Sequence, residues 1–226
     1  MKIKESLTLY EKIKELNPKH ILELGTGIGC STEFMAFACP KASITTVESD
    51  DKCIELAKVL IPEVTQERIY FRQSKVRLSA IYEVDPFVEW LSYDDYPQRE
   101  YDFILVDGPG PTVLTKKHPV TGKSWEGLAE LPGADIIFLL PRMKEGIIVY
   151  VDGRRNLINL ALRHLQGYLE VIEDRGLYKD HTGKEFPLNY TIFKRNSKTL
   201  KDDLSDFVRS DTFYTTLKEN GYFDKL

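Results

Sequence analysis

The sequence contains no continuous apolar run that approaches the ~20 residues of a membrane-spanning helix, and no dense tract of lysine and arginine. Its formal net charge is −4, whereas proteins that bind nucleic acid usually carry a basic surface. Hydrophobic residues make up 42% of the 226 residues, which is enough for a buried core and too little for an integral membrane protein. The composition therefore favours one globular domain and indicates neither a membrane nor a nucleic acid as a partner.

Cysteine is also scarce. The cysteines are odd in number, and their spacing suits neither a zinc site nor a disulfide framework; they are Cys30, Cys39 and Cys53. The first residues, Met1–Glu5, form a charged segment without the apolar stretch of a signal peptide. Both features predict a protein of the reducing cytoplasm.

The glycines are concentrated at one informative place. The segment His20–Ser31 is a short apolar run that ends in an acid and is followed by glycine at alternate positions, Gly25, Gly27 and Gly29. Glycine permits a positive φ and a close approach of the backbone to a ligand. The helix that follows offers free N–H groups to an anion. This strand–turn–helix segment predicts a site for a nucleotide-like molecule.

The turn lacks the third glycine of the dinucleotide fingerprint Gly-x-Gly-x-x-Gly. Counted from Gly25, that glycine falls on Cys30, and counted from Gly27 it falls on Thr32. A carboxylate at Glu48, after the next apolar run, can accept both hydroxyl hydrogens of a ribose. An NAD-binding protein uses an acid at the same place, so Glu48 alone leaves the nucleotide open.

Strand-like and helix-like runs alternate along the chain, and they predict five strand–helix units followed by a hairpin. The expected strands are His20–Leu24, Ser43–Glu48, Arg68–Arg72, Tyr101–Val106, Gly146–Val151, Leu169–Glu173 and Tyr190–Arg195. The expected helices are residues 2–16, Ser31–Cys39, a helix from Asp51 that Pro62 closes, Val76–Leu91, Ala134–Lys144 and Arg155–Leu165. Too few residues separate the last two strands for a crossover helix, so they form an antiparallel hairpin.

This order of elements divides the chain into three parts. Residues 1–18 form an N-terminal helix, residues 19–196 an α/β domain, and residues 197–226 a polar-aromatic tail with helical spacing. The exposed tail is a candidate surface for assembly into a homo-oligomer.

The spacing acid-x-Gly-x-Gly-x-Gly from Glu23 to Gly29, with a second acid at Glu48, resembles the S-adenosylmethionine (SAM) site of the class I SAM-dependent methyltransferases. The resemblance implies an α/β fold with a seven-stranded, mostly parallel, doubly wound sheet (Rossmann-like) and a C-terminal antiparallel hairpin. It also implies SAM as the cofactor. The residues that would bind SAM are Glu23, Gly25, Thr26, Gly27, Gly29, Ser31, Glu48, Ser74 and Asp107.

In this interpretation, residues at the ends of different strands bind different parts of SAM. Glu23 and Ser31 address the methionine end of SAM, although Ser31 is equally well explained as a helix N-cap. Ser74 and backbone groups contact the adenine, at a position where many members of the family have an acid.

The run Glu-Leu-Gly-x(4)-Ser within the turn looks most like the catechol and macrolide O-methyltransferase branch. In that branch a magnesium ion, held by aspartates equivalent to Asp107 and Asp152, positions a pair of substrate oxygens. The sequence departs from the branch at Gly153, where a third protein ligand is expected, and at 108–111, where a basic residue is expected. The alternative is that Asp107 helps to fix SAM and Asp152 caps the following helix.

The segment 112–133 is the candidate substrate lid, because a loop of this length in a compact domain is usually functional or disordered. It contains His118, whose imidazole titrates near working pH and is the candidate general base. The other interpretation of His118 is a solvent-exposed loop residue. Asp107, at the start of this irregular stretch, is the second candidate catalytic residue.

Together these features favour a SAM-dependent methyltransferase that acts on oxygen of a small molecule or glycan-like metabolite. Three alternatives stay open. They are an NAD(P)-dependent oxidoreductase, an aminopropyltransferase-like enzyme, which would share the fold, and a non-catalytic SAM-binding member.

Overall fold

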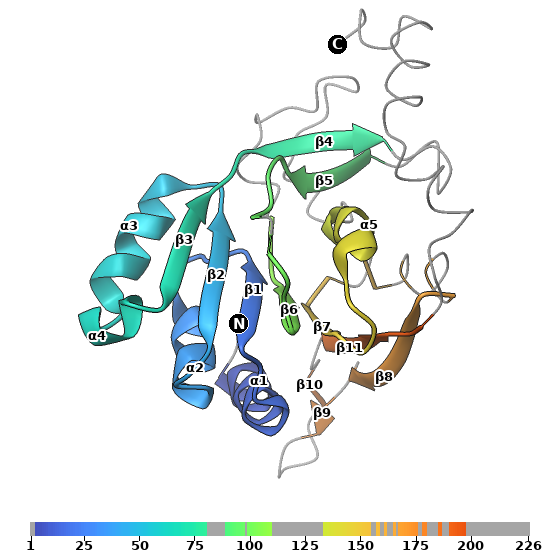
Figure 1. Ribbon diagram of the computed structural model, residues 1–226, viewed down its shortest axis with the longest axis horizontal. Coiled ribbons are helices and arrows are strands. Elements are labelled where there is room, and N and C mark those ends of the chain that lie inside the picture. The colour runs from blue at the N-terminus through green and yellow to red at the C-terminus, as the bar shows by residue number, and fades with distance from the viewer. Residues whose placement is uncertain are drawn as a thin grey trace, which may run out of the picture.

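A seven-stranded sheet forms the centre of the computed structural model, with strand order β3-β2-β1-β6-β7-β11-β8 (Figure 1). Its strands are β1 (His20–Leu24), β2 (Ser43–Glu48), β3 (Ile69–Gln73), β6 (Phe103–Val106), β7 (Ile148–Asp152), β8 (Leu169–Arg175) and β11 (Tyr190–Arg195). The structure describes residues 3–80, 89–97, 99–109, 133–154, 157, 158, 161, 165, 167–175, 178, 179, 185, 186 and 190–197.

Strands β3, β2, β1, β6 and β7 pair in parallel, and β11 runs antiparallel to both β7 and β8. The order changes direction at β1, which has β2 on one side and β6 on the other. This arrangement confirms the predicted α/β fold with a mostly parallel, doubly wound sheet and a C-terminal antiparallel pair.

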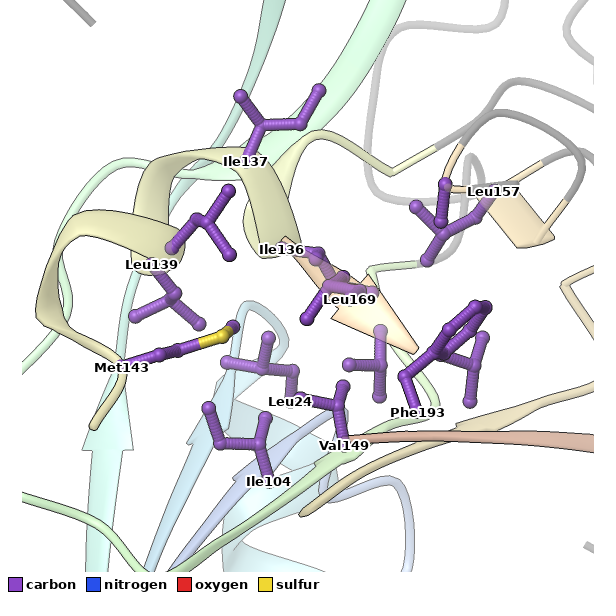
Figure 2. Packing of buried hydrophobic residues seen from close by; sticks show 14 of the residues in the cluster. Leu24, Ile104, Ile136, Ile137, Leu139, Met143, Val149, Leu157, Leu169 and Phe193 are labelled. Atoms are coloured by element: carbon purple, nitrogen blue, oxygen red, sulfur yellow. The ribbon is translucent and has the colours of Figure 1, made fainter. Parts of the chain in front are cut away.

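The central strands are buried on both faces, as expected for parallel strands that are covered on both sides. One face of the sheet packs on α5 (Asp135–Leu139), and Figure 2 shows Leu24, Ile104 and Val149 meeting Ile136 from that helix. The opposite face packs on α1 (Ile3–Leu16), α2 (Cys30–Ala38) and α3 (Asp51–Leu60). Burial on both faces fixes the register of these strands, because a slip by one residue would exchange the two faces.

Side chains define the ends of the helices beside the sheet. The carboxylate of Asp50 accepts a 2.9 Å hydrogen bond from the Lys52 N–H and so caps α3. At the C-terminal end of α2, the Arg68 guanidinium donates to the carbonyl oxygens of Ala36, Cys39 and Ala42. These contacts satisfy backbone groups that the helix itself leaves unpaired.

The prediction of a helix over Val76–Leu91 is wrong. Residues Val76–Ala80 form β4 and Glu89–Tyr93 form β5, and the two pair antiparallel as a ribbon beyond the carboxyl ends of β2 and β3 (Figure 1). The sequence of β4, Val-Arg-Leu-Ser-Ala, alternates apolar and polar residues, which is the pattern of a strand. The pairing of β4 with β5 agrees with this alternation in the sequence.

Other boundaries differ by a few residues. The predicted helix Ala134–Lys144 is α5 followed by a short 3₁₀ turn, Leu140–Arg142, because Pro141 removes a backbone donor. A one-turn helix, α4 (Glu63–Gln66), was not predicted. Two-residue strands β9 (Tyr178–Lys179) and β10 (Glu185–Phe186) pair with each other.

Three predicted segments lie outside the described residues. They are the lid at 112–133 except its last residue, most of the helix Arg155–Leu165, and the tail from residue 198. The three-part division of the chain and the role of the tail in assembly stay predictions. Among the described residues, none of the helices is both long and apolar enough to cross a membrane.

Candidate functional site

The site lies where β1 separates β2 from β6, at the carboxyl ends of these strands. The N–H of Gly25, directly after β1, donates to the Val47 carbonyl of β2 at 2.9 Å. On the other side, the N–H of Asp107, directly after β6, donates to the Leu24 carbonyl at 2.8 Å. In open α/β sheets this switch point is where ligands bind, and the predicted glycine turn starts at it.

Gly25 cannot be replaced by a larger residue without moving its neighbours. Its φ is +98°, and a Cβ built on it would lie 2.7 Å from the backbone carbon and oxygen of Asp107 and from the nitrogen of Gly108. The turn therefore rests directly on the peptide that follows β6. Gly27 also has a positive φ, +52°, but a Cβ there would have no atom within 4 Å.

Glu23 is completely buried beneath this turn. Its carboxylate accepts hydrogen bonds from the hydroxyls of Ser31 and Thr32, in the first turn of α2, and a 2.7 Å bond from Thr46 of β2. Burial raises the pKa of Glu23 to about 7, while the three hydroxyl donors lower it and nearby Asp107 raises it. Glu23 thus ties the start of α2 to β1 and β2.

The same cluster accounts for two other predicted residues. Ser31 donates its only hydroxyl proton to Glu23, and it is buried. The hydroxyl groups of Thr26 and Thr46 are joined by a 2.5 Å hydrogen bond. Ser31 does not cap α2: the N-cap is Gly29 in the left-handed conformation, and no side chain of the described residues caps this helix.

Glu48, at the end of β2, reaches across to the glycine turn. Its Oε2 accepts a 2.9 Å hydrogen bond from the Gly27 N–H, and its Oε1 accepts from the N–H groups of Ser49 and Asp50 at 2.7 and 3.1 Å. The residue is 8% exposed. Its carboxylate is therefore fixed in orientation at the edge of the turn.

Ser74 follows β3 and is buried. Its backbone N–H donates to the Glu48 carbonyl at 2.8 Å, and its hydroxyl accepts from the Asp95 N–H at 3.0 Å. The structure thus places Ser74 next to Glu48, along the same edge of the sheet.

Asp107 directly follows β6 and Asp152 ends β7, and these two strands are parallel neighbours with Val106 in register with Val151. The convergence of the two carboxylates above the sheet stays a prediction. Among the described residues, no group of three or more His, Cys, Asp or Glu side chains could hold a metal ion. His118 lies outside the described residues.

Arg154 is a site residue that the sequence analysis did not single out. Its guanidinium donates through Nη1 to the Pro109 carbonyl at 2.9 Å and through Nη2 to the Asp107 carbonyl. The signal available in the sequence was its position two residues after Asp152, at the end of a strand adjacent to the one that Asp107 follows.

A buried acid, Asp135, lies beside this arginine and was also missed. It accepts a 2.9 Å hydrogen bond from the Tyr93 N–H and another from the Tyr96 hydroxyl. Burial raises the pKa of Asp135 to about 6, against the lowering effects of these donors and of the Arg154 charge. Tyr93 itself approaches the site: its hydroxyl lies 2.6 Å from where a Cβ on Gly108 would be.

No protein-family model matches the sequence, and no curated protein matches it. Solved structures do match. The O-methyltransferase TomG from Streptomyces achromogenes, which is involved in tomaymycin synthesis and was solved with SAM, is 15% identical with a TM-score of 0.51. The match covers 87% of this chain and 82% of that chain.

Two further structures extend the comparison. An O-methyltransferase from Bacillus cereus in complex with S-adenosylhomocysteine (SAH) is 15% identical with a TM-score of 0.52, over 87% of this chain and 82% of that one. A precorrin-6y C5,15-methyltransferase from Geobacter metallireducens is 13% identical with a TM-score of 0.52, over 85% and 87%. At these identities the likeness is one of fold, and it agrees with the resemblance to class I methyltransferases.

Proposed function

We propose that the protein is a SAM-dependent methyltransferase that transfers a methyl group to oxygen of a small molecule or glycan-like metabolite. The observation that supports this most is the direct packing of Gly25 on the Asp107–Gly108 peptide, at the switch point of the sheet. The glycine turn there is open on the side of Gly27 and is bordered by the carboxylate of Glu48. Structures of the same fold include proteins in complex with SAM and SAH.

The start of α2 fits the carboxylate of the methionine end. The helix has nine residues and no side chain caps it, so its first backbone N–H groups remain for an anion. The Ser31 hydroxyl proton is donated to Glu23, so the backbone and not the hydroxyl would donate to that carboxylate. Asp107 and the ionised form of Glu23 then favour an ammonium and a sulfonium, and a bound cation would in turn favour that ionised form, since the pKa of Glu23 is about 7 without ligand.

Glu48 fits the ribose. Oε1 of Glu48 already accepts from the N–H and hydroxyl of Ser49 and from the Asp50 N–H, whereas Oε2 accepts from the Gly27 N–H and keeps room for a ribose hydroxyl. Those backbone donors hold the carboxylate in place before the nucleoside arrives. Ser74, one strand further, is the proposed neighbour of the adenine.

When bound, SAM supplies a methyl group on a sulfonium leaving group that needs no further activation. The work left to the protein is to align the acceptor oxygen with the methyl group, which can supply much of the rate. We assign this alignment to the bend that begins at Asp107. A hydroxyl acceptor must also lose its proton, and we propose that His118 in the segment 112–133 takes it.

Within the part of the chain that the structure describes, the side chains do not form a magnesium site of three or more protein ligands. Mg²⁺ takes near-octahedral oxygen coordination and usually keeps several waters; Asp107 and Asp152 offer two carboxylates, and Gly153, at the position of the expected third ligand, has no side chain. The guanidinium of Arg154 adds a positive charge beside Asp107. We therefore route no step of the reaction through a metal.

Calorimetric titration of the purified protein with SAM, SAH and NAD tests the proposal. We expect SAM and SAH to bind at micromolar concentrations and NAD not to bind. NAD binding without SAM or SAH binding would show an oxidoreductase instead. Tight SAH binding without methyl transfer to any member of a broad panel of hydroxylated acceptors would favour the non-catalytic alternative. Transfer of an aminopropyl group from decarboxylated SAM would identify an aminopropyltransferase-like enzyme.

A further inference from the structure

Arg154 connects the ends of two strands. It follows β7 by two residues, and its guanidinium reaches the chain that follows the adjacent strand β6. Two of its nitrogens donate to two carbonyl oxygens of the same bend, those of Asp107 and Pro109. A planar guanidinium can make both bonds at once in a fixed geometry, which a lysine ammonium cannot reproduce.

The bend that Arg154 holds is also one wall of the proposed cofactor site. The Gly25 Cα approaches the Asp107–Gly108 peptide so closely that an added Cβ would lie 2.7 Å from three of its backbone atoms. From another direction, the Tyr93 hydroxyl lies 2.6 Å from where a Cβ on Gly108 would be. A rotation of the Asp107 carbonyl would therefore move the surface on which the glycine turn rests.

The charge of Arg154 has a buried counterpart. The carbonyl oxygens it binds are neutral, but its positive charge acts on Asp135, where it partly opposes the rise in pKa that burial causes. Asp135 is fully buried and accepts from the Tyr93 N–H and the Tyr96 hydroxyl. Because a charge in a partly buried place is costly without a counter-charge, the attraction between the two groups offsets part of the cost of placing a guanidinium here.

We propose that Arg154 is a positioning residue for cofactor binding: by holding the carbonyls of Asp107 and Pro109 it fixes the bend against which the amino-acid half of SAM lies. This inference rests on the proposed function. It assigns Arg154 no contact with the reacting atoms. Its effect reaches the cofactor through the Asp107–Gly108 peptide, so a change at Arg154 alters cofactor affinity more than it alters the stability of the sheet.

SAH binding by the full-length protein, measured by calorimetry, tests the inference. We expect Arg154→Lys to weaken SAH binding by about tenfold, which corresponds to the loss of one net hydrogen bond. We expect Arg154→Ala to weaken it more, and millimolar guanidinium to restore part of the affinity of that variant. Guanidinium rescue is a readout that a general loss of packing would not give. Arg142→Lys, an exposed arginine ahead of β7, is the matched control and should bind as the wild type does.

The outcomes separate the two proposals. If the wild type does not bind SAH, the proposed function fails. If the wild type binds SAH and both Arg154 variants bind it equally well, the positioning role is overturned while the proposed function stands. If Arg154→Ala does not fold, Arg154→Lys decides alone, because it keeps the charge and most of the side chain. Its melting temperature should stay close to that of the wild type while its affinity falls.

Discussion

The backbone N–H of Gly27 donates a 2.9 Å hydrogen bond to Oε2 of Glu48. This bond joins the glycine turn after β1 to the end of β2, across the edge where the strands meet the proposed ligand. A single carboxylate thereby sets both the position of the turn and the acceptor for a ribose. A substitution at Glu48 should therefore weaken cofactor binding in two ways, by releasing the glycine turn and by removing the acceptor for the ribose.

Glu48→Gln tests this double role. Glutamine keeps one acceptor oxygen, but its amide group would face one of the backbone N–H donors of Gly27, Ser49 and Asp50. We expect SAH binding to weaken by on the order of 100-fold, the effect of about two lost hydrogen bonds. Calorimetry measures it, with Glu55→Gln on the exposed face of α3 as the control. Unchanged affinity in Glu48→Gln would remove this residue from the site.

A pair of glycine substitutions separates steric from conformational effects in the turn. Both Gly25 and Gly27 have positive φ, so Ala at either position costs roughly 1 kcal/mol of backbone strain. Only at Gly25 would the new Cβ also collide with the Asp107–Gly108 peptide, at 2.7 Å. We expect Gly25→Ala to lower the free energy of unfolding by about 3 kcal/mol or more and Gly27→Ala by about 1 kcal/mol.

Urea denaturation of the two variants measures these costs, and SAH titration shows whether the wall of the site has moved. Equal destabilisation in Gly25→Ala and Gly27→Ala would contradict the close packing of the turn on the bend after β6.

The buried acid Glu23 makes stability depend on pH. Its pKa is about 7 in the folded protein against 4.5 as the ordinary value, so between these values the folded chain holds a proton that the unfolded chain has released. The free energy of unfolding therefore falls as the pH rises through this window, by at most about 3 kcal/mol from this group. Below the window the contribution is constant.

Glu23→Gln removes this titration. Urea denaturation across the window should show the wild type losing stability relative to the variant as the pH rises from about 4.5 to about 7. Glu63→Gln, at an exposed position in α4, should follow the wild type. If the Glu23→Gln and wild-type stability curves run parallel, the carboxyl is already ionised at the acid end of the range.

Alkylation of cysteine maps the ligand without any substitution. Cys30 is exposed and is the first residue of α2, next to the N–H groups proposed to bind the methionine carboxylate. We expect saturating SAH to slow its reaction with iodoacetamide by about tenfold, since bound small molecules cover most of the surface of their sites. Cys53 on α3 is the internal reference and Cys39 is buried. Peptide mass spectrometry reads all three, and equal Cys30 rates with and without bound SAH would place the ligand elsewhere.

The sequence predicts the cofactor edge of the fold well because its signals there are local. The bounds of β1 and β2 agree with the prediction to the residue, since an apolar run ends at a glycine turn or an acid in each case. The ribbon β4–β5 was missed because Val76–Leu91 has enough apolar residues for either period. The strand conformation of this segment is stabilised by the pairing of β4 with β5, which is a tertiary contact.

The parts of the site that the sequence did not predict are those made by long-range contacts. Arg154 binds carbonyl oxygens 45 and 47 residues away, and Asp135 binds the Tyr93 N–H at a separation of 42. A carbonyl acceptor carries no side-chain identity, so no motif marks it. The sequence predicted Glu23 as a residue of the methionine end of SAM, which stays a prediction, and its three hydroxyl donors become evident only when α2 is placed on the sheet.

The described chain continues past β6 to Pro109 and resumes at Gly133, beside the β4–β5 ribbon, and each of these points is anchored independently. Arg154 holds the first, while the second forms a bridge with Leu91, whose carbonyl also accepts the Ala134 N–H at 2.6 Å. Lengthening a stretch whose ends are already fixed adds little entropic cost. In the proposed methyltransferase, where this segment is the substrate lid, the choice of acceptor could therefore change while the cofactor site stays the same.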